Sequence, residues 1–349
     1  MYHPRVENEI ITLGIETSCD ETAASILKGR FEILSSVVAS QNEIHSIYGG
    51  VVPELACRKH CEIIRSIAHE SLDKADVVLN DLDLVAVTRG PGLVGALLVG
   101  LSYAKALAWG MKIPLVGVNH LEGHVMSAFL AQPRIPLPNL SLLVSGGHTE
   151  LFIMNELGKL EWIGGTRDDA AGEAYDKVAK MLGLGYPGGP EVDRMSRSGS
   201  ATIKVPAAMM NSSDLDFSFS GPKTAVKHII EDYKNKGLSL PVEDICASFQ
   251  ASVVRALINK TLFAIEKTNP ASISLSGGVA ANGALREAFL RLGEELGLPA
   301  IIPKLELCQD NAAMIASAGA NRYLSNPKDK AWLDFLEMDP KSSWIPNGD

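Results

Sequence analysis

The sequence predicts an α/β protein in which one fold is used twice. Segments 9–40 and 139–165 each contain three apolar runs separated by polar turns, and strands alternate with helices after each segment. A Pro-rich connector near residues 131–139 separates the two halves. Because the alternating part implies crossover helices, we expect parallel, buried sheets.

The first half reads as a three-stranded meander followed by alternating helices and strands. Its polar turns lie at Glu16–Glu21 and Lys28–Arg30. The expected later elements are a helix from about Pro53 to Lys74, a strand at 83–88, a long apolar helix from Gly92 and a strand at 114–118, which leads into the residues NHLEGH.

The second half repeats this order from Asn139. Three strands precede helices from Asp169, and the expected later elements are a strand near 271–276, a helix at Val279–Leu296 and a last helix from Asp310 to about Leu324. We therefore expect an N-terminal domain at 1–133, a C-terminal domain at 134–325 and a peripheral tail at 326–349.

Composition favours a soluble, cytoplasmic protein. The chain has 349 residues, 46% hydrophobic and 21% charged, and its N-terminus shows no targeting pattern. The most apolar stretch, Gly92–Gly110, is interrupted by Ser102, Tyr103 and Lys105, so no membrane helix is expected. A net charge of −9 argues against a generally basic nucleic-acid-binding surface but allows a local patch, such as Arg58, Lys59, His60 and Arg65.

Three polar turns follow apolar strands and form candidate anion-binding sites. They are Glu16–Asp20, Ser145–Thr149 and Ser276–Gly278, the last with Asn282. Each alone is typical of a tight turn, but the three together favour a nucleotide site. Two meander-plus-crossover domains with such turns are typical of the actin-like class (ASKHA, ribonuclease H-like), which holds a nucleotide in a central cleft.

The residues GPGLVG, 90–95, match a dinucleotide-binding pattern but are not expected to bind one. The next strand ends in Val118 and Asn119, where a ribose-binding acid should lie, and the motif is not on the first strand of its domain. We interpret these glycines as allowing the apolar helix to pack closely on the sheet.

The residues NHLEGH, 119–124, predict a metal site. A spacing of four places His120 and His124 on one helix face, where both rings can reach one ion, and Asn119 suits the helix N-cap. Glu122 lies about 200° around the helix from His120 and so points away from that face. The motif therefore lacks the base of a metalloprotease.

Asp310 is the candidate third ligand. It lies in CQDNAAMIASAGA at the start of a late helix, where a role as the helix N-cap explains it equally well. Two histidines and a carboxylate would leave coordination positions open, which suits iron(II) or zinc holding a substrate.

Ten ordered motifs from residue 14 to 319 closely resemble the TsaD family, the tRNA N6-adenosine threonylcarbamoyltransferases. In order they are GIETSCDETAASI, YGGVVPELACRKH, RGPGLVGALLVG, NHLEGH, LLVSGGHTEL, DDAAGEAYDKVAK, GLGYPGGP, DFSFSGPKT, SGGVAANGALR and CQDNAAMIASAG. The resemblance implies an actin-like fold and transfer of the threonylcarbamoyl group from threonylcarbamoyl-AMP to N6 of adenosine 37 in tRNAs reading ANN codons.

The resemblance also implies a cofactor, site residues and partners. The metal would be Fe2+, one per subunit, held by His120, His124 and Asp310, with Zn2+ or Mg2+ as substitutes in vitro. The adenylate would lie against the following residues: Leu143, Val144, Ser145, Gly146, Gly147, Asp176, Gly189, Asp193 and Asn282. Expected partners are the tRNA anticodon loop, a TsaB-like paralogue bound through the N-terminal domain and a TsaE-like ATPase, or a second copy of the chain in their absence.

The residues also bear on the alternative functions. Actin-like kinases place an aspartate at the end of the first strand of each domain, whereas Glu16 and Ser145 stand there. These replacements weaken a site for γ-phosphate transfer, so an actin-like ATPase or sugar kinase is kept only as the alternative function. A metallopeptidase is less favoured still. No Ser or Cys nucleophile with a neighbouring base is evident, so we expect direct transfer without a covalent enzyme intermediate.

Overall fold

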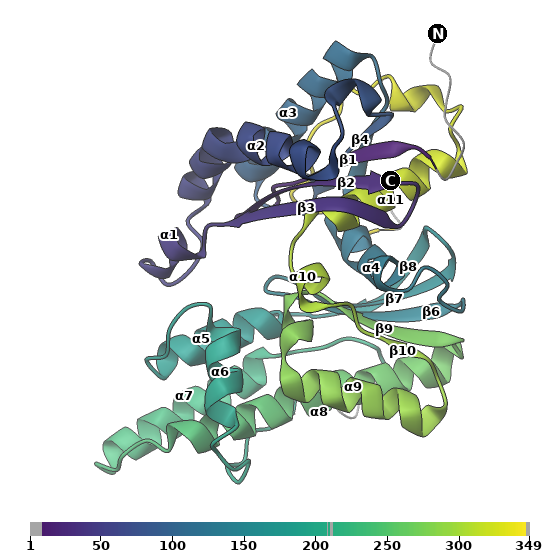
Figure 1. The fold of residues 1–349 in the computed structure, drawn as a ribbon. Coiled ribbons are helices and arrows are strands. Elements are labelled where there is room, and N and C mark those ends of the chain that lie inside the picture. Colours follow the sequence, from purple (N-terminus) through teal and green to yellow (C-terminus); the bar gives the residue numbers. More distant parts are fainter. Residues whose placement is uncertain (1–8, 208, 210–211, 347–349) are drawn as a thin grey trace. The chain divides into compact units, whose positions relative to one another are not determined.

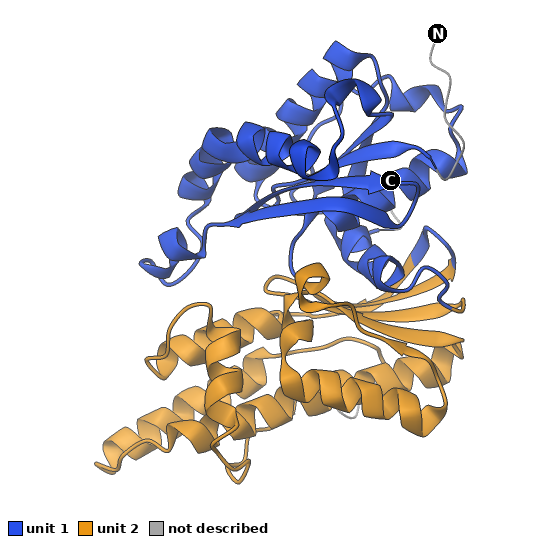
Figure 2. Ribbon diagram, viewed as in Figure 1, with its two compact units in different colours: residues 1–135, 156–160, 309–349 blue, residues 136–155, 161–308 orange. Residues whose placement is uncertain are grey.

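The computed structural model describes residues 9–207, 209 and 212–346, so the ends of the expected first domain and tail, 1–8 and 347–349, lie outside the described residues. The chain divides into two compact units (Figure 2). Unit 1 comprises 1–135, 156–160 and 309–349, and unit 2 comprises 136–155 and 161–308.

Within the described residues, the strands form two five-stranded sheets with the same strand order (Figure 1). The first sheet runs β3 (Glu32–Ser40), β2 (Glu21–Lys28), β1 (Ile11–Glu16), β4 (Leu84–Gly90) and β5 (Leu115–Asn119). The second runs β8 (Lys159–Gly165), β7 (Thr149–Glu156), β6 (Asn139–Val144), β9 (Ser272–Ser276) and β10 (Ala300–Ile301).

Strand direction is repeated as well. In each sheet the first strand in sequence pairs antiparallel with the second and parallel with the strand that follows the crossover. These central strands are buried along their whole length, as the parallel part of a sheet covered on both faces requires. The repeat confirms the predicted duplicated, actin-like α/β fold.

In unit 1, helices cover both faces of the sheet. Helices α2 (Pro53–Ala75) and α3 (Val94–Met111) pack on one face, over a core that includes Leu13 and Ile15. Between these residues Gly14 faces the other way, toward α11 (Ala312–Ser325), which lies beside α4 (His120–Ala131). Short helices α1 (Asn42–Ser46), η1 (Leu79–Asp81) and η3 (Lys330–Trp332) lie in the connections.

The C-terminal part of the chain belongs to unit 1, which differs from the expected division. The sequence predicts helix α11 within a domain at 134–325. In the structure its small side chains let it pack closely on β1 and β4 of unit 1. The segment after it was expected to be peripheral, yet Phe335 is only 4% exposed and contributes to the core of unit 1. Neither contact is visible in the local pattern, because both join residues that are far apart in sequence.

Helix α3 is the one helix among the described residues that is long and apolar enough, by length and composition alone, to cross a membrane. A third of this window, 33%, is buried inside the structure, where α3 packs on β4 and α2. A single helix of this kind is weak evidence for a membrane span.

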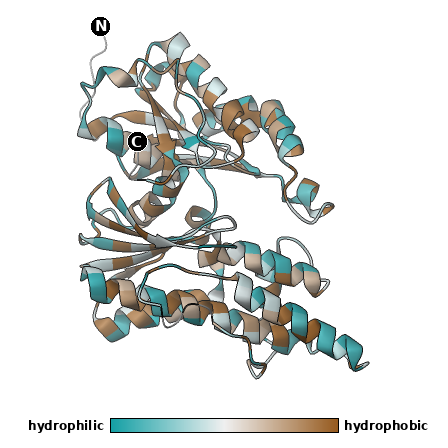
Figure 3. Ribbon diagram, turned by 180° about the vertical axis from the view of Figure 1, so that it is seen from behind, coloured by the Kyte–Doolittle hydropathy of each residue, from teal (hydrophilic) through white to brown (hydrophobic). Residues whose placement is uncertain are grey.

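In unit 2, the helices pack into a core with the inner side of the sheet. They are α5 (Ala171–Met181), α6 (Gly188–Ser196), α7 (Ser220–Asn235), α8 (Val242–Thr268), α9 (Gly283–Leu296) and α10 (Leu305–Cys308). Tyr175 of α5 and Phe249 of α8 meet edge to face at 5.2 Å in the centre of this core. Figure 3 shows hydrophobic residues along the strands and on the helices that pack on them.

The helix expected at Val279–Leu296 is divided in two. A 3-10 turn, η2 (Gly278–Ala281), comes first, and α9 starts only at Gly283, because the Asn282 side chain caps it by accepting the Leu285 N–H at 3.0 Å.

We expect Gly14→Ala to destabilise unit 1. A Cβ at residue 14 would lie 2.2 Å from the Ala312 carbonyl oxygen and 2.8 Å from the Ala316 Cβ, so α11 would have to move away from the sheet. Overpacking of this kind costs about 1–3 kcal/mol, which urea denaturation followed by circular dichroism measures.

Gly110→Ala is the matched control, since no heavy atom of the described residues lies within 4 Å of its added Cβ. Its stability should be equal to or slightly above wild type. An equal loss in both variants would contradict the close packing of α11 on β1.

Candidate metal centre and nucleotide-binding turns

Helix α4 begins at the predicted residue. Asn119 ends β5 in an extended conformation, and its side-chain oxygen accepts the Leu121 N–H at 2.9 Å and the Glu122 N–H at 3.4 Å. This confirms Asn119 as the N-cap. The cap places His120 at the first position of the helix, so that His124 follows one turn later on the same side.

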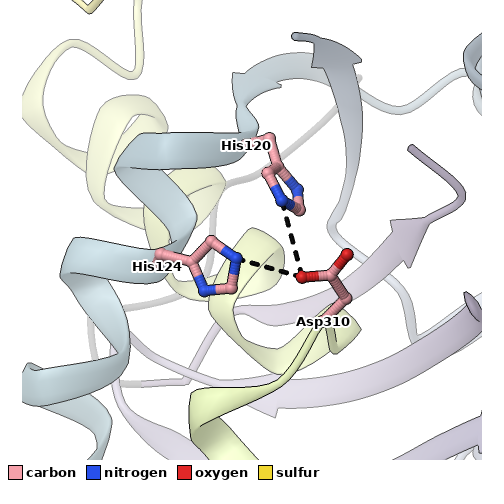
Figure 4. Close-up of side chains that lie close together, drawn as sticks. All are labelled: His120, His124 and Asp310. Atoms are coloured by element: carbon pink, nitrogen blue, oxygen red, sulfur yellow. Dashed lines mark ion pairs between the residues drawn. The ribbon is translucent and has the colours of Figure 1, made fainter. Parts of the chain in front are cut away.

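The structure brings His120, His124 and Asp310 together within unit 1 (Figure 4). Asp310 Oδ1 lies 3.0 Å from His124 Nε2 and 3.5 Å from His120 Nε2. One ligand atom from each residue lies within 4.8 Å of the others, close enough to hold one metal ion. Both rings are buried, and their centroids are 4.7 Å apart.

Asp310 is not a helix cap, which removes its alternative role. The N-cap of α11 is Asn311, whose side chain accepts the Met314 N–H at 3.0 Å. Asp310 stands just before this cap, and its carboxylate faces the two histidines instead of the helix end. A local pattern cannot distinguish these adjacent residues, because both Asp and Asn suit an N-cap.

Glu16 orients the His120 ring, a role that the sequence did not reveal. Its Oε2 lies 3.1 Å from His120 Nδ1, and the Ser18 hydroxyl lies 3.2 Å from the same nitrogen. The Thr88 hydroxyl donates to Glu16 as well. A carboxylate on Nδ1 leaves Nε2 directed at Asp310, as in the carboxylate–histidine pairs that support metal ligands. The signal for Glu16 in the sequence is its position at the end of β1, but that position predicts contact with a nucleotide and not with His120.

The charges around these residues fit a cation. Burial by itself lowers the pKa of His120, but the Asp310 and Glu16 carboxylates raise it to about 9. Burial together with Asp310 and Asp20 raises the pKa of Glu21 to about 10, which shows how crowded the carboxylates are.

His124 fits the same conclusion by its hydrogen bonding. It is 0% exposed, and neither ring nitrogen makes a hydrogen bond among the described residues, although Nε2 lies 3.0 Å from the Asp310 carboxylate. A buried polar atom without a partner is costly, and a metal ion bound at Nε2 would remove part of that cost. The residues present therefore fit a divalent metal.

Glu122 points away from this group, as predicted. It is 2% exposed and forms a double contact with Arg322 of α11, at 2.6 Å between Oε2 and Nη2 and 3.0 Å between Oε1 and Nε. Gly123 makes room for α11 too, since a Cβ there would lie 2.8 Å from Ile315 Cδ1. The two residues between the histidines thus join α4 to α11.

The glycines of GPGLVG do not serve the packing that was expected of them. A Cβ at Gly90 would lie 1.8 Å from the Lys341 carbonyl oxygen, and a Cβ at Gly92 would lie 2.6 Å from that of Ser18. These glycines admit the C-terminal segment and the turn after β1, whereas the expectation was close packing of α3 on the sheet.

In unit 2, the predicted turns gather at the ends of β6 and β9. The Gly172 N–H at the start of α5 donates to the Ser145 carbonyl at 3.3 Å. A Cβ at Gly277, which has φ of +89°, would lie 2.4 Å from the Val144 carbonyl oxygen. Leu143 and Val144 are 0% exposed, backbone included, whereas a Cβ at Gly146 or Gly147 would meet no described atom within 4 Å.

The other predicted adenylate residues continue from these turns. Asp176 accepts the Gly188 N–H at 2.7 Å, next to Gly189 at the start of α6. Further along α6, Asp193 Oδ1 accepts from the Asn282 side-chain amide at 3.2 Å. Hydrogen bonds therefore join the turn after β6 to α5, α5 to α6, and α6 to the cap of α9, and the predicted residues lie along these elements of unit 2.

Gln250 joins this set, although nothing in the sequence singled it out. Its Oε1 accepts from Asn282 Nδ2 at 2.6 Å, and its Nε2 donates to the Ser196 hydroxyl at 2.8 Å. Gln250 is 6% exposed. It lies on α8, and only the tertiary fold brings it beside α6 and the cap of α9.

The expected basic patch is weaker than its sequence suggests. Arg58 pairs with Glu54 and Lys59 with Glu62, both on the surface of α2. His60 is fully buried and lies 2.7 Å from the Thr22 hydroxyl and 3.0 Å from the Cys19 carbonyl oxygen. It supports the turn after β1 and is not part of a surface patch.

Comparison with known families connects this geometry to one activity. The family model described as TsaD, tRNA N6-adenosine threonylcarbamoyltransferase, matches residues 32–317. The chain belongs to this family of acyltransferases. It is 49% identical over 319 residues to the tRNA N6-adenosine threonylcarbamoyltransferase of Clostridioides difficile, a match that covers 91% of this chain and 94% of that protein. It is 51% identical over 322 residues to that of Bacillus cereus, with 91% and 93% covered.

Solved structures with low sequence identity share the fold. The HypF protein of T. kodakarensis aligns with a TM-score of 0.65 at 13% identity, over 94% of this chain and 50% of that protein. Component A of the Acidaminococcus fermentans (R)-2-hydroxyglutaryl-CoA dehydratase aligns with a TM-score of 0.52 at 17% identity, over 90% of this chain and 100% of that one. These likenesses confirm the architecture alone.

We expect Glu16→Gln to weaken metal binding about tenfold, because supporting partners of metal ligands typically contribute that much or more. The substitution keeps the size of the side chain but removes the charge that holds Nδ1 of His120. Titration calorimetry with Zn2+ measures the affinity.

Glu43→Gln is the control, since this glutamate lies exposed on α1. Its affinity should equal that of the wild type. If Glu16→Gln bound Zn2+ as tightly as the control, the supporting role of Glu16 would be wrong.

Proposed function

We propose that this protein transfers the threonylcarbamoyl group from threonylcarbamoyl-AMP to N6 of adenosine 37 in tRNAs that read ANN codons. In this reaction the adenine amine attacks the carbamoyl carbon, the bond from that carbon to the phosphate oxygen breaks, AMP leaves, and the amine loses a proton. Family membership over most of the chain supports the reaction class.

The observation that carries the proposal is the His120, His124 and Asp310 group in unit 1. Three protein ligands leave coordination positions open for a substrate. We propose Fe2+ as the metal, one per subunit, with Zn2+ or Mg2+ as substitutes in vitro. When bound, the metal would supply Lewis acidity toward the oxygens of the donor.

The protein's own residues would prepare this site for its ligand. Glu16 would keep Nε2 of His120 available, and Asn119 would hold the first turn of α4 so that both rings stay on one side. An adenine amine is a weak nucleophile, so exact placement of the two substrates must contribute much of the rate. No covalent enzyme intermediate is part of this proposal.

The adenylate would bind along the contacts that join the turns of unit 2. The Ser145 N–H already donates to the His148 carbonyl at 2.8 Å. The backbone N–H groups of the exposed Gly146 and Gly147 would face phosphate oxygens, since exposed N–H groups in such a turn attract anions. Asp176, Gly189, Asp193 and Asn282 would surround the nucleoside.

The proposed partners are the tRNA anticodon loop, a TsaB-like paralogue and a TsaE-like ATPase, or a second copy of the chain in their absence. Exposed apolar residues on α3 support a protein partner at unit 1, since Val94, Leu98 and Trp109 are 52%, 51% and 68% exposed. We also propose a cytoplasmic location, since the proposed substrate is a tRNA.

Neither alternative function fits the site as well. An actin-like kinase needs a free acid at the end of the first strand, but the Glu16 carboxylate is fully buried and bonded to Ser18, Thr88 and His120. A metallopeptidase needs a glutamate beside the metal, but Glu122 is paired with Arg322 on α11.

We expect cells depleted of their own family member to lose threonylcarbamoyl-adenosine from tRNA and to regain it with this protein. His120→Ala should not restore it, because the metal would lose a ligand. His69→Ala, which changes an exposed histidine on α2, should restore it fully. Mass spectrometry of digested tRNA measures the nucleoside, and failure of the wild-type protein to restore it in the depleted cells would refute the proposed function.

We expect Gln250→Ala to raise the KM for threonylcarbamoyl-AMP about five- to tenfold with a smaller change in kcat, because of its two hydrogen bonds only the one to Asn282 acts on the proposed adenylate site, and losing it costs about 1 kcal/mol. The loss would leave Asn282 free to turn away from Asp193. Steady-state kinetics with purified tRNA measure both constants. Gln132→Ala, an exposed glutamine after α4, is the control; equal constants in the two variants would exclude a positioning role for Gln250.

A further inference from the structure

The segment Leu333–Pro346, here called the C-terminal strap, runs back over unit 1 after α11. At its start Phe335 is buried in the core, and the Leu336 carbonyl accepts from Lys105 Nζ of α3 at 2.8 Å. Met338 reaches β5, where a Cβ at Gly117 would lie 2.7 Å from its sulfur. The strap is therefore fixed to the sheet before it reaches α4.

The middle of the strap pairs with the end of β4 and the turn that follows. The Lys341 N–H donates to the Arg89 carbonyl at 2.7 Å, and the Gly92 N–H donates to the Ser342 carbonyl at 3.3 Å. Arg89 Nε donates to the Asp339 carbonyl at 2.7 Å. Only glycine fits at residue 90, given its distance from the Lys341 oxygen. These bonds fix the backbone on both sides of Pro340.

Trp344 then contacts the cap of the metal-binding helix. Its carbonyl accepts from Asn119 Nδ2 at 3.0 Å. The oxygen of the same Asn119 side chain accepts the first N–H groups of α4, next to His120. The amide of Asn119 therefore joins the strap to the helix start, and its orientation is set from both sides.

The indole ring of Trp344 makes a second connection to α4. Arg322 Cζ lies 5.6 Å from the ring centroid, and this guanidinium is the one that pairs with Glu122. Arg89 Cζ and Lys341 Nζ lie 6.0 and 5.0 Å from the same ring. Cations near the face of a Trp ring are attracted by its π electrons. Trp344 thus stabilises Arg322 in the position from which it holds Glu122, between the two histidines.

We propose that Trp344 is a positioning residue for the metal centre and that the strap holds the first turn of α4 through it. A ligand set works only when its side chains are held within about 0.5 Å of the required geometry. One connection from Trp344 acts on Asn119, adjacent to His120, and the other acts through Arg322 on Glu122, between the two histidines, whereas neither touches the metal ligands themselves. The inference rests on the proposed metal-binding role of His120, His124 and Asp310.

The test is binding of Co2+ to the full chain, since its visible absorption spectrum reports the ligand geometry. Trp344→Ala should lower Co2+ affinity about tenfold, the scale of supporting contacts at metal sites, and should change the spectrum. Trp344→Phe keeps an aromatic face and should recover most of the affinity. Ile345→Ala, at a neighbouring residue that is 55% exposed, should behave as wild type.

Asn119→Asp tests the other connection, because it keeps the cap oxygen for α4 and removes the N–H that reaches Trp344. It should lower Co2+ affinity as Trp344→Ala does, and the double variant should lose no more than the single variants combined. Unchanged affinity and spectra in both single variants would overturn the proposal, as would an equal loss in Ile345→Ala.

Hydrogen exchange of the metal-free protein gives a second, independent measurement. Trp344→Ala should speed exchange at the Leu121 and Glu122 amides relative to those in α2, while the thermal unfolding midpoint changes little. If the wild type failed to bind Co2+, the metal part of the proposed function would fail, and exchange at α4 would still decide the role of the strap. Equal exchange in wild type and Trp344→Ala would refute it.

Discussion

The close packing of α11 against β1 and α4 is the constraint on which the candidate metal centre depends. Asp310 stands just before α11, so the carboxylate reaches the histidines only if this helix lies close to the sheet. Gly14 on β1 and Gly123 on α4 remove the side chains that would keep it away. The Glu122–Arg322 contact joins the same two helices near the histidines. Small residues and one ion pair thus bring Asp310 next to His120 and His124, almost two hundred residues earlier in the chain.

The second feature of this centre is an excess of carboxylates. Asp310 and Glu16 face His120 from its two nitrogens, and the pKa of nearby Glu21 is raised to about 10 by burial and by neighbouring acids. Removing charged groups from water is costly unless opposite charge compensates them. A divalent cation would compensate these charges, and His124, whose ring nitrogens make no hydrogen bond among the described residues, would be one of its ligands.

The fold is shared with proteins of other activities, so the function lies in its sites. In unit 1 the acid at the end of β1, which an actin-like kinase would direct at a nucleotide, is buried against His120 and Thr88. In unit 2 the corresponding turn after β6 carries Ser145 and two glycines with open space beside them. The family to which the chain belongs transfers an acyl group, and an acid turned toward a candidate metal ligand is compatible with such chemistry.

The sequence by itself determined the local features of this protein. Apolar runs predicted the strands, and polar turns predicted where the strands end. The spacing of Asn119, His120 and His124 predicted a capped helix with two histidines on one face. These features depend on interactions over a few residues, which a linear pattern records.

Only the tertiary structure decided which distant residues meet. In the folded protein Asp310 faces the histidines, while its neighbour Asn311 is the N-cap of α11. It also brings Glu16 into contact with His120, Gln250 with Asn282 and Trp344 with Asn119. Such pairs are joined through packing across a sheet or between helices, and their separation along the chain leaves no periodic signal from which they could be predicted.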